Sequence, residues 1–250
     1  PYLFGRDLWD ETRIPLFEQA VSVGGAVLQE RVSFGFRYAR HSIMETFRAN
    51  VDRYPVLLPD RLDDPPERLP HLRLHNGTIW RWNRPLIGFE ADGRPHVRIE
   101  HRVLPSGPSV ADMIANAALY FGAVQDLLSE EPAPETRLMF LHAQKGFYAC
   151  ARNGLAAEIP WLDGKVHPVT RILQEDLLPR ARRGLRELGV DRAESAHWLG
   201  IIAQRLESGQ TGARWQRAWI ARHGHDMAGL TRAYLDHQAS GRPVHEWTTD

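Results

Sequence analysis

A proline-rich break at residues 105–108 divides this chain into two stretches of different character. Before it, residues 75–104 are rich in β-branched and aromatic side chains that alternate with a period of two, which is typical of strands. After it, apolar side chains recur at helical spacing almost to the end of the chain. This division predicts an α+β fold, in which a small antiparallel sheet at about residues 75–104 packs with a predominantly helical remainder.

Local signals define elements within both stretches. Asp92-Gly93 predicts a tight turn between two strands, and the first fifty residues are expected to be mostly helical. Ser109 predicts an N-cap, with Asp112 in the first turn of the helix that follows. We expect a single domain over residues 1–250, with helices and the sheet in 1–108 and a helical part in 109–250. The helices expected in that part cover residues 110–128, 137–151, 169–188, 193–208, 212–223 and 227–241.

Composition excludes several classes of protein. The 250 residues include 31 basic and 31 acidic side chains and are 43% hydrophobic, which is enough for a substantial core. Only Lys145 and Lys165 among the basic residues are lysine, but an arginine-rich nucleic-acid-binding domain would need a one-sided basic surface, which the balanced charge does not favour. No apolar run approaches the roughly 18 residues of a membrane span. The single cysteine, Cys150, is interpreted as a buried structural thiol and indicates a reducing, cytoplasmic location.

The strand at residues 97–103 carries a row of charges. Because alternate side chains of a strand share a face, Arg98, Glu100 and Arg102 are expected on one side. Two interpretations stay open for this row. It is either a solvated ladder of salt bridges, or a metal-binding carboxylate flanked by guanidiniums that bind phosphate or carboxylate groups.

Two further arginines are candidates for ligand binding. Arg84 ends the preceding strand, where a positioned cation often meets a ligand. Arg214 follows a glycine-rich turn that begins a helix, and such a turn either receives an anion on its backbone donors or simply connects two helices. The chain contains no GxxxxGK[ST] or GxGxxG phosphate loop and no GxSxG nucleophile elbow.

Taken in order, four segments resemble the glutamate–cysteine ligase family, of the carboxylate–amine ligase type with a glutamine-synthetase-like catalytic fold. The similarity covers about residues 70–220. It is carried by "GTIWRWNRP", "HVRIEHRVLPSGPSV", "YACARNGLAAEI" and "LESGQTGARWQRAW", which begin at residues 77, 96, 148 and 206.

The resemblance implies an ATP- and Mg²⁺-dependent ligase that phosphorylates a glutamate-like carboxylate and joins it to an amine. By position, Glu100 would be a magnesium ligand, while Arg102 and Arg84 would be catalytic contacts to phosphate or the substrate carboxylate. Arg98 and Arg214 would bind the ATP cofactor. Small molecules are the expected partners, without nucleic acid or membrane, and a homo-oligomer is a possible assembly.

The sequence also departs from the family's pattern. It contains no paired Glu-x-Glu strand, which in the family holds most of the magnesium, and no aspartate within residues 103–107. Since one carboxylate does not hold several hard cations, the chain, which begins at Pro1, is expected to be the C-terminal part of a longer ligase and inactive alone. The same departure supports an alternative, a non-catalytic interaction or regulatory module on a ligase-like scaffold. The sequence does not identify the amine substrate, for which cysteine is one option.

Overall fold

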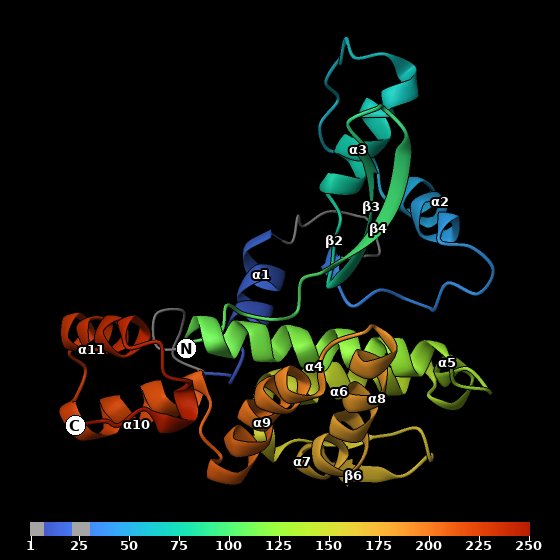
Figure 1. Ribbon diagram of the computed structural model, residues 1–250. Helices are drawn as coiled ribbons and strands as arrows, with labels where there is room; N and C mark the ends of the chain where they lie inside the picture. The colour runs from blue at the N-terminus through green and yellow to red at the C-terminus, as the bar shows by residue number, and fades with distance from the viewer. Residues whose placement is uncertain (1–7, 22–30) are drawn as a thin grey trace. The chain divides into compact units, whose positions relative to one another are not determined.

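A computed structural model describes residues 8–21 and 31–250 (Figure 1). The chain divides into two compact units. Unit 1 comprises Ser106–Asp250 and the described residues up to Arg13. Unit 2 comprises the described residues of Ile14–Pro105. Helices dominate and short two-stranded sheets accompany them, so the predicted α+β class is confirmed.

Unit 1 is largely helical, as predicted. The helices expected over 110–128 and 212–223 have those bounds, and the others agree within a few residues. A π-helical turn at Leu173–Leu177 joins the helix Val169–Ile172 to the helix Leu178–Glu187. The elements are α4 (Val110–Leu128), α5 (Pro134–Arg137), α6 (Phe140–Asn153), β5 (Glu158–Pro160), β6 (Val166–Pro168), α7 (Val169–Ile172), α8 (Leu178–Glu187), α9 (Arg192–Ser208), α10 (Gly212–His223) and α11 (Met227–Ala239).

Helix α4 begins at a buried capping box. The Ser109 hydroxyl accepts the backbone N–H of Asp112, and the Asp112 carboxylate accepts the backbone N–H of Ser109, which confirms the predicted cap. Asp112 is fully buried and also binds two distant groups. Its Oδ1 accepts Nη2 of Arg205 at 2.6 Å, and its Oδ2 accepts the backbone N–H of Val244 at 2.9 Å. The start of α4 is thereby joined to α9 and to the C-terminal segment.

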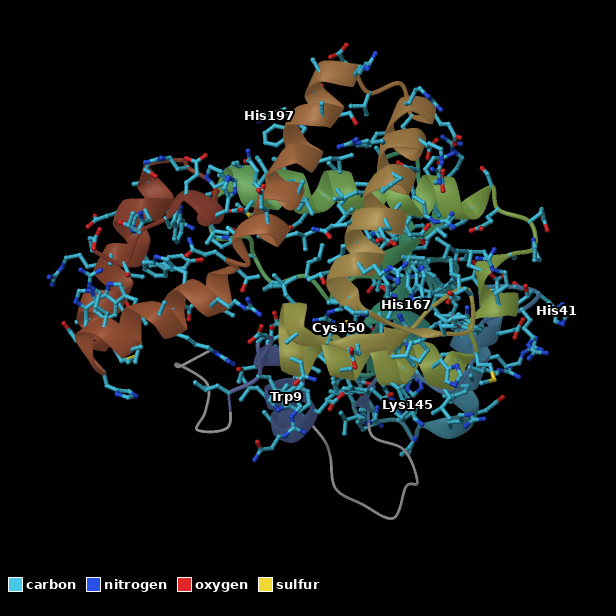
Figure 2. All side chains as sticks on the ribbon, turned by 90° about the horizontal axis from the view of Figure 1, so that it is seen from below. Trp9, His41, Lys145, Cys150, His167 and His197 are labelled. Carbon is cyan, nitrogen blue, oxygen red and sulfur yellow. The ribbon has the colours of Figure 1, made fainter. Side chains whose placement is uncertain are left out.

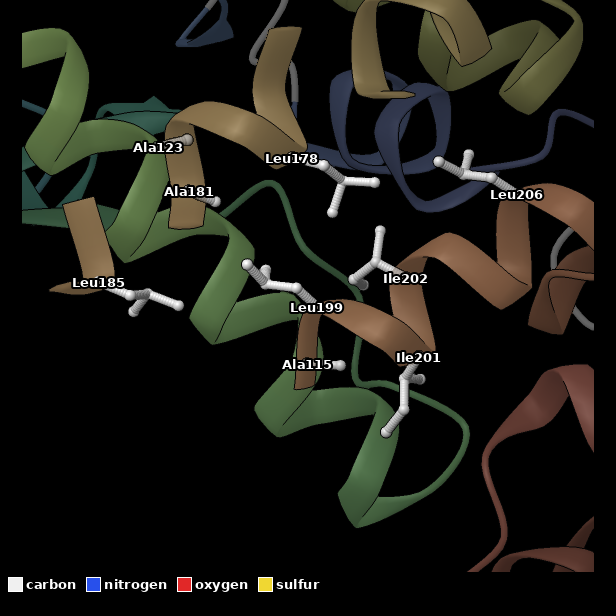
Figure 3. Close-up of a cluster of buried hydrophobic side chains, with 9 residues drawn as sticks. All are labelled: Ala115, Ala123, Leu178, Ala181, Leu185, Leu199, Ile201, Ile202 and Leu206. Carbon is white, nitrogen blue, oxygen red and sulfur yellow. The ribbon is translucent and has the colours of Figure 1, made fainter. Parts of the chain in front are cut away.

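The main core of unit 1 lies where α8 and α9 pack against α4 (Figure 1). Two glycines allow α4 and α8 to approach closely: a Cβ on Gly184 would lie 2.9 Å from the carbonyl carbon of Gly122, and a Cβ on Gly122 would meet the backbone of Ala181. Nine buried side chains fill the surrounding space (Figure 3). They are Ala115, Ala123, Leu178, Ala181, Leu185, Leu199, Ile201, Ile202 and Leu206.

Unit 2 combines short helices with two pairs of strands. The strands β1 (Val32–Ser33) and β2 (Trp80–Arg81) pair in parallel, and β3 (Asn83–Phe89) and β4 (Pro95–His101) form an antiparallel hairpin. Its helices are α2 (Met44–Arg53), α3 (Pro70–Gly77) and α1 (Arg13–Val21), which starts at the boundary with unit 1.

A buried amide pair links these elements. The Asn50 side chain on α2 donates to that of Asn76 on α3 at 3.0 Å, and Asn76 in turn donates to the carbonyl of Pro85 on β3 at 2.9 Å. Both amides are almost fully buried, so these bonds satisfy groups that water does not reach. They fix the hairpin to the helical part of unit 2.

Two details of the sequence prediction for unit 2 are wrong. Residues 75–77 belong to α3, not to a strand, because Pro70 starts a helix that runs to Gly77. Residues 34–43, inside the region expected to be mostly helical, are irregular, and α2 begins only at Met44, since the Glu45 carboxylate accepts the backbone N–H groups of residues 40, 41 and 42. The parts of the expected N-terminal helical region at 1–7 and 22–30 lie outside the described residues.

Among the described residues, the structure contains no helix whose length and apolar character suffice to cross a membrane.

Candidate functional site

The β3–β4 hairpin places Arg84 directly opposite Glu100. The register pairs these two residues across the ladder, and Asp92-Gly93 lies in the connecting turn, as predicted. Gly93 has a φ of 86°, a conformation that glycine adopts without strain, and its N–H donates to the Glu90 carbonyl at 2.9 Å. The turn therefore sets the register that brings the charged residues together.

Glu100 lies between two guanidinium groups. Its Oε2 is 3.1 Å from Nε and 2.9 Å from Nη2 of Arg84, and 3.6 Å from Nε of Arg102. The side chains of Arg84, Glu100 and Arg102 are 12%, 37% and 26% exposed, so the cluster is half-buried but open to solvent. We name Arg84, Glu100 and Arg102 the hairpin cluster.

Further contacts hold both arginines in place. Nη1 of Arg84 donates to the Gly77 carbonyl at 3.3 Å, at the end of α3. The Arg102 guanidinium lies over the Trp80 ring, 4.5 Å from its centroid, and Trp80 itself packs on Phe17 at 5.1 Å. Because these side chains are already ordered, little rotamer entropy would be lost when an anion binds them.

Arg98 does not join the hairpin cluster. It is exposed, and its Nη1 lies 3.1 Å from Nε2 of His96. His101 follows Glu100 directly in β4 and so lies on the opposite face of the strand, with Nδ1 2.7 Å from the Asn83 side-chain oxygen, and burial lowers its pKa. The structure thus brings together three of the four charged hairpin residues that the sequence singled out.

The described residues do not by themselves fit a magnesium ion. Magnesium takes about six oxygen ligands, and one carboxylate supplies one or two of them. In residues 8–21 and 31–250 there is no group of three or more His, Cys, Asp or Glu side chains that could hold a metal ion. Oε2 of Glu100 is also engaged by two cations, so metal binding by Glu100 stays a prediction.

Arg214 lies in unit 1, on the first turn of α10. Its Nη1 donates to the Gly209 carbonyl at 3.0 Å. It lines a cavity of about 460 Å³ together with Arg152 from the end of α6 and Arg217 from α10. The other residues of this cavity are Leu8, Trp9, Asp10, Asn153 and Ala156.

The cavity joins two of the four segments on which the family resemblance depends. Arg152 belongs to "YACARNGLAAEI", and Arg214 and Arg217 belong to "LESGQTGARWQRAW". Sequence reasoning did not select Arg152 or Arg217 as site residues. The spacing of Arg214 and Arg217, three residues apart on a predicted helix, was a usable signal that both share one face.

Cys150 takes no part in either group of residues. It lies on α6 (Figure 2), where burial raises its pKa to about 11. The thiol is therefore protonated near neutral pH and is a poor nucleophile, in agreement with its interpretation as a structural residue.

Comparison with protein families gives one clear result. The model of glutamate-cysteine ligase family 2 matches residues 1–236, which is most of the chain. The chain therefore belongs to this family of ligases, and the resemblance found in its sequence is confirmed. Comparisons with curated proteins and with solved structures gave no match.

Proposed function

We propose that this chain carries part of the active site of an ATP- and Mg²⁺-dependent carboxylate–amine ligase. The observation that supports this most is the hairpin cluster, in which Glu100 holds Arg84 and Arg102 side by side. Family membership supports the ligase class. The proposed substrates are a glutamate-like acid and an amine, in a cytoplasmic protein.

In the proposed reaction, an oxygen of the acid's carboxylate bonds to the terminal phosphorus of ATP, and the bond to ADP breaks. The amine nitrogen then bonds to the carbonyl carbon of the acyl phosphate, the bond from that carbon to the phosphate oxygen breaks to release inorganic phosphate, and the nitrogen loses a proton. Negative charge collects on phosphate oxygens in both steps. Arg84 and Arg102 would bind these oxygens, and Glu100 would keep the two guanidiniums aligned.

The cofactor contacts are part of the proposal. Two separate proposals concern contacts to ATP: Arg98 on the exposed face of β4 in unit 2, and Arg214 on α10 in unit 1, each taken within its own unit. Magnesium would need oxygen ligands beyond those that the described residues supply, so we assign no step to it.

A second candidate function is a non-catalytic module on the ligase scaffold. The observation that favours it is the pairing of Glu100 with two arginines, which is also what a structural salt-bridge cluster would show. In this case the cluster would stabilise the hairpin without contacting a substrate.

The experiment measures ADP release by the complete reading frame with Mg²⁺-ATP, glutamate and a panel of amino acids and amines. We expect glutamate-dependent ADP release that falls at least about 100-fold in Glu100→Gln. Glu90→Gln is the matched control, because Glu90 lies near the hairpin turn and pairs with His96 outside the cluster. Unchanged activity in Glu100→Gln would show that Glu100 has no role in the active site. A folded wild-type protein that releases no ADP with any acceptor would favour the non-catalytic module.

A further inference from the structure

A second cavity of unit 1 lies beside the β5–β6 hairpin, and it shares no residue with the hairpin cluster or with the cavity of Arg214. Its lining includes residues of α5, α7, the π-helical turn and α8. We infer that this cavity binds a free α-amino acid with an apolar side chain, in its zwitterionic form. The inference does not depend on ligase activity, because binding is measurable without turnover.

Balanced charge is the first argument. Apart from His167, the charged residues of the lining are three arginines and three carboxylates, namely Arg137, Arg171, Arg180, Asp163, Glu175 and Asp176. A ligand with a single charge would find as much repulsion as attraction in such a lining. A ligand that carries both charges is attracted at both of its ends, so the lining favours a zwitterion.

Two of the arginines keep hydrogen-bond donors for a carboxylate. Among the residues that the structure describes, the Arg171 side chain donates only through Nε, to Glu175 at 2.7 Å, and the Arg137 side chain only through Nη1, to Glu130 at 2.8 Å. A guanidinium has five N–H donors in a planar fork that matches a carboxylate. Arg180 differs, because its Nε, Nη1 and Nη2 all donate to carboxylates and are already used in the wall of the cavity.

Glu175 and Asp163 supply acceptors for the ammonium group. Their side chains are 64% and 48% exposed, and Glu175 uses only Oε2 for Arg171. Nε2 of His167 on β6 (Figure 2) lies 2.8 Å from Oδ2 of Asp163, and this hydrogen bond lowers the pKa of Asp163. Asp163 therefore stays ionised near neutral pH and attracts an ammonium group.

Trp161 gives the cavity an aromatic wall. Its Nε1 donates to Oδ2 of Asp176 at 2.8 Å, and Oδ1 of the same carboxylate accepts Nε of Arg180 at 2.7 Å, so the direction of the ring is fixed. The ring is half-buried and lies beside Leu162 and Ile172 in the lining. Such a wall packs on the carbon atoms of an apolar side chain and also attracts an ammonium group.

The size and the local backbone agree with a small ligand. The volume of about 310 Å³ lies at the lower end of the roughly 300–1,000 Å³ that is usual for small-molecule sites, which suits an amino acid better than a nucleotide. Glu175 and Asp176 reach the cavity from the π-helical turn, and single π-turns are frequent at functional sites. The exposed pair of Arg171 and Glu175 contributes little to stability, so a ligand can replace it at small cost.

Calorimetric titration of the full chain with L-leucine, 4-methylpentanoate and 3-methylbutylamine tests the inference. The three probes share one branched carbon chain, but 4-methylpentanoate lacks the ammonium group and 3-methylbutylamine lacks the carboxylate. We expect L-leucine to bind, and each of the other two to bind at least about tenfold more weakly.

Two substitutions locate the binding site. Arg171→Gln and Glu175→Gln are each expected to weaken the binding of L-leucine at least about tenfold. The matched controls are Arg242→Gln and Glu246→Gln, because Arg242 and Glu246 form an exposed pair with the same spacing in unit 1, at 2.8 Å and outside the cavity. All four side chains are exposed at the surface, so their substitution is expected to leave the fold intact, and circular dichroism checks this.

Three results would overturn the inference. They are no binding of L-leucine up to about 10 mM, binding of either singly charged probe as tight as that of L-leucine, and equal weakening in the cavity variants and their controls. The second result would show that the cavity recognises one charge or the carbon chain alone. The third would place the amino acid elsewhere on the protein.

Discussion

The α4–α8 pair and the β3–β4 hairpin differ in how tightly their surfaces are packed. Between the helices, Gly122 and Gly184 bring the backbones so close that no side chain fits there. In the hairpin, Val97 and Ile99 are 46% and 50% exposed, although they form the apolar row of β4. The apolar surfaces of the two helices are thus buried against each other, whereas much of the apolar surface of the hairpin is exposed.

The difference separates the region that stabilises the fold from the region that is accessible to a ligand. A tightly packed core is destabilised by changes of side-chain volume and has no room for a ligand. The hairpin presents charged side chains at a half-open surface, where they are accessible from solvent and contribute little to stability. We therefore expect substitutions in the helix pair to change the free energy of unfolding, and those in the hairpin to change it little.

The largest effect is expected for Gly184→Ala. The added Cβ would meet the backbone of Gly122 and lie 3.0 Å from the backbone nitrogen of Asp126, so α4 and α8 must move apart. We expect the free energy of unfolding to fall by about 2–3 kcal/mol in denaturant titration. The matched control is Gly200→Ala on α9, where a Cβ meets nothing within 4 Å.

The control should change stability in the opposite direction. Alanine is favoured over glycine in a helix by up to about 1 kcal/mol, so Gly200→Ala is expected to raise the free energy of unfolding. If both variants were equally stable, the close approach of α4 and α8 would not be a source of tight packing.

A smaller effect is expected for Asp126→Asn. The Asp126 carboxylate accepts Nε and Nη2 of Arg183 at 2.7 and 2.9 Å and Nη1 of Arg180 at 2.9 Å, and these guanidiniums lower its pKa. We expect a loss of about 1.5 kcal/mol at pH 7.

The pH dependence of this loss follows from the direction of the pKa shift. Because the folded pKa lies below the unfolded one, the carboxylate's contribution is complete above about pH 5 and disappears as the pH falls through the folded value. Urea titrations of both proteins from pH 7 to pH 2 measure the difference. A difference that stays constant down to pH 2 would show that ionisation of Asp126 is not the cause.

The smallest effect is expected for Ile99→Thr on the hairpin. Threonine keeps the β-branched shape, and half of the isoleucine side chain is already exposed, so the free energy of unfolding should change by less than about 0.5 kcal/mol. A loss above about 2 kcal/mol would mean that this face is covered in solution, and it would contradict the comparison.

The fold was predictable where local signals decide it. Ser109 and Asp112 predict the start of α4 because a cap acts on backbone groups only three residues away. The prediction failed at residues 75–77, because the helix that starts at Pro70 extends through them although the sequence that follows has the composition of a strand. It failed again before Met44, where Glu45 satisfies the backbone of an irregular segment, a contact that periodicity does not reveal.

The candidate sites divide in the same way. The contact between Arg84 and Glu100 follows from the turn at Asp92-Gly93, because the turn determines which residues face each other across the hairpin. The cavity of Arg152, Arg214 and Arg217 depends on residues 8–10 lying against α6 and α10. Such long-range contacts depend on tertiary packing, which the pattern of a single sequence does not specify.

The buried carboxylate of Asp112 has a consequence for the order of synthesis. It accepts the N–H of Val244, 132 residues further along the chain, and it is fully buried in the folded unit. A ribosome that has just completed α4 has therefore made a helix whose Asp112 carboxylate is bonded to Ser109 but still lacks its distant partners, Arg205 and Val244. Since domains generally fold as units during synthesis, we expect unit 1 to reach its native state only after residue 244 has left the ribosome.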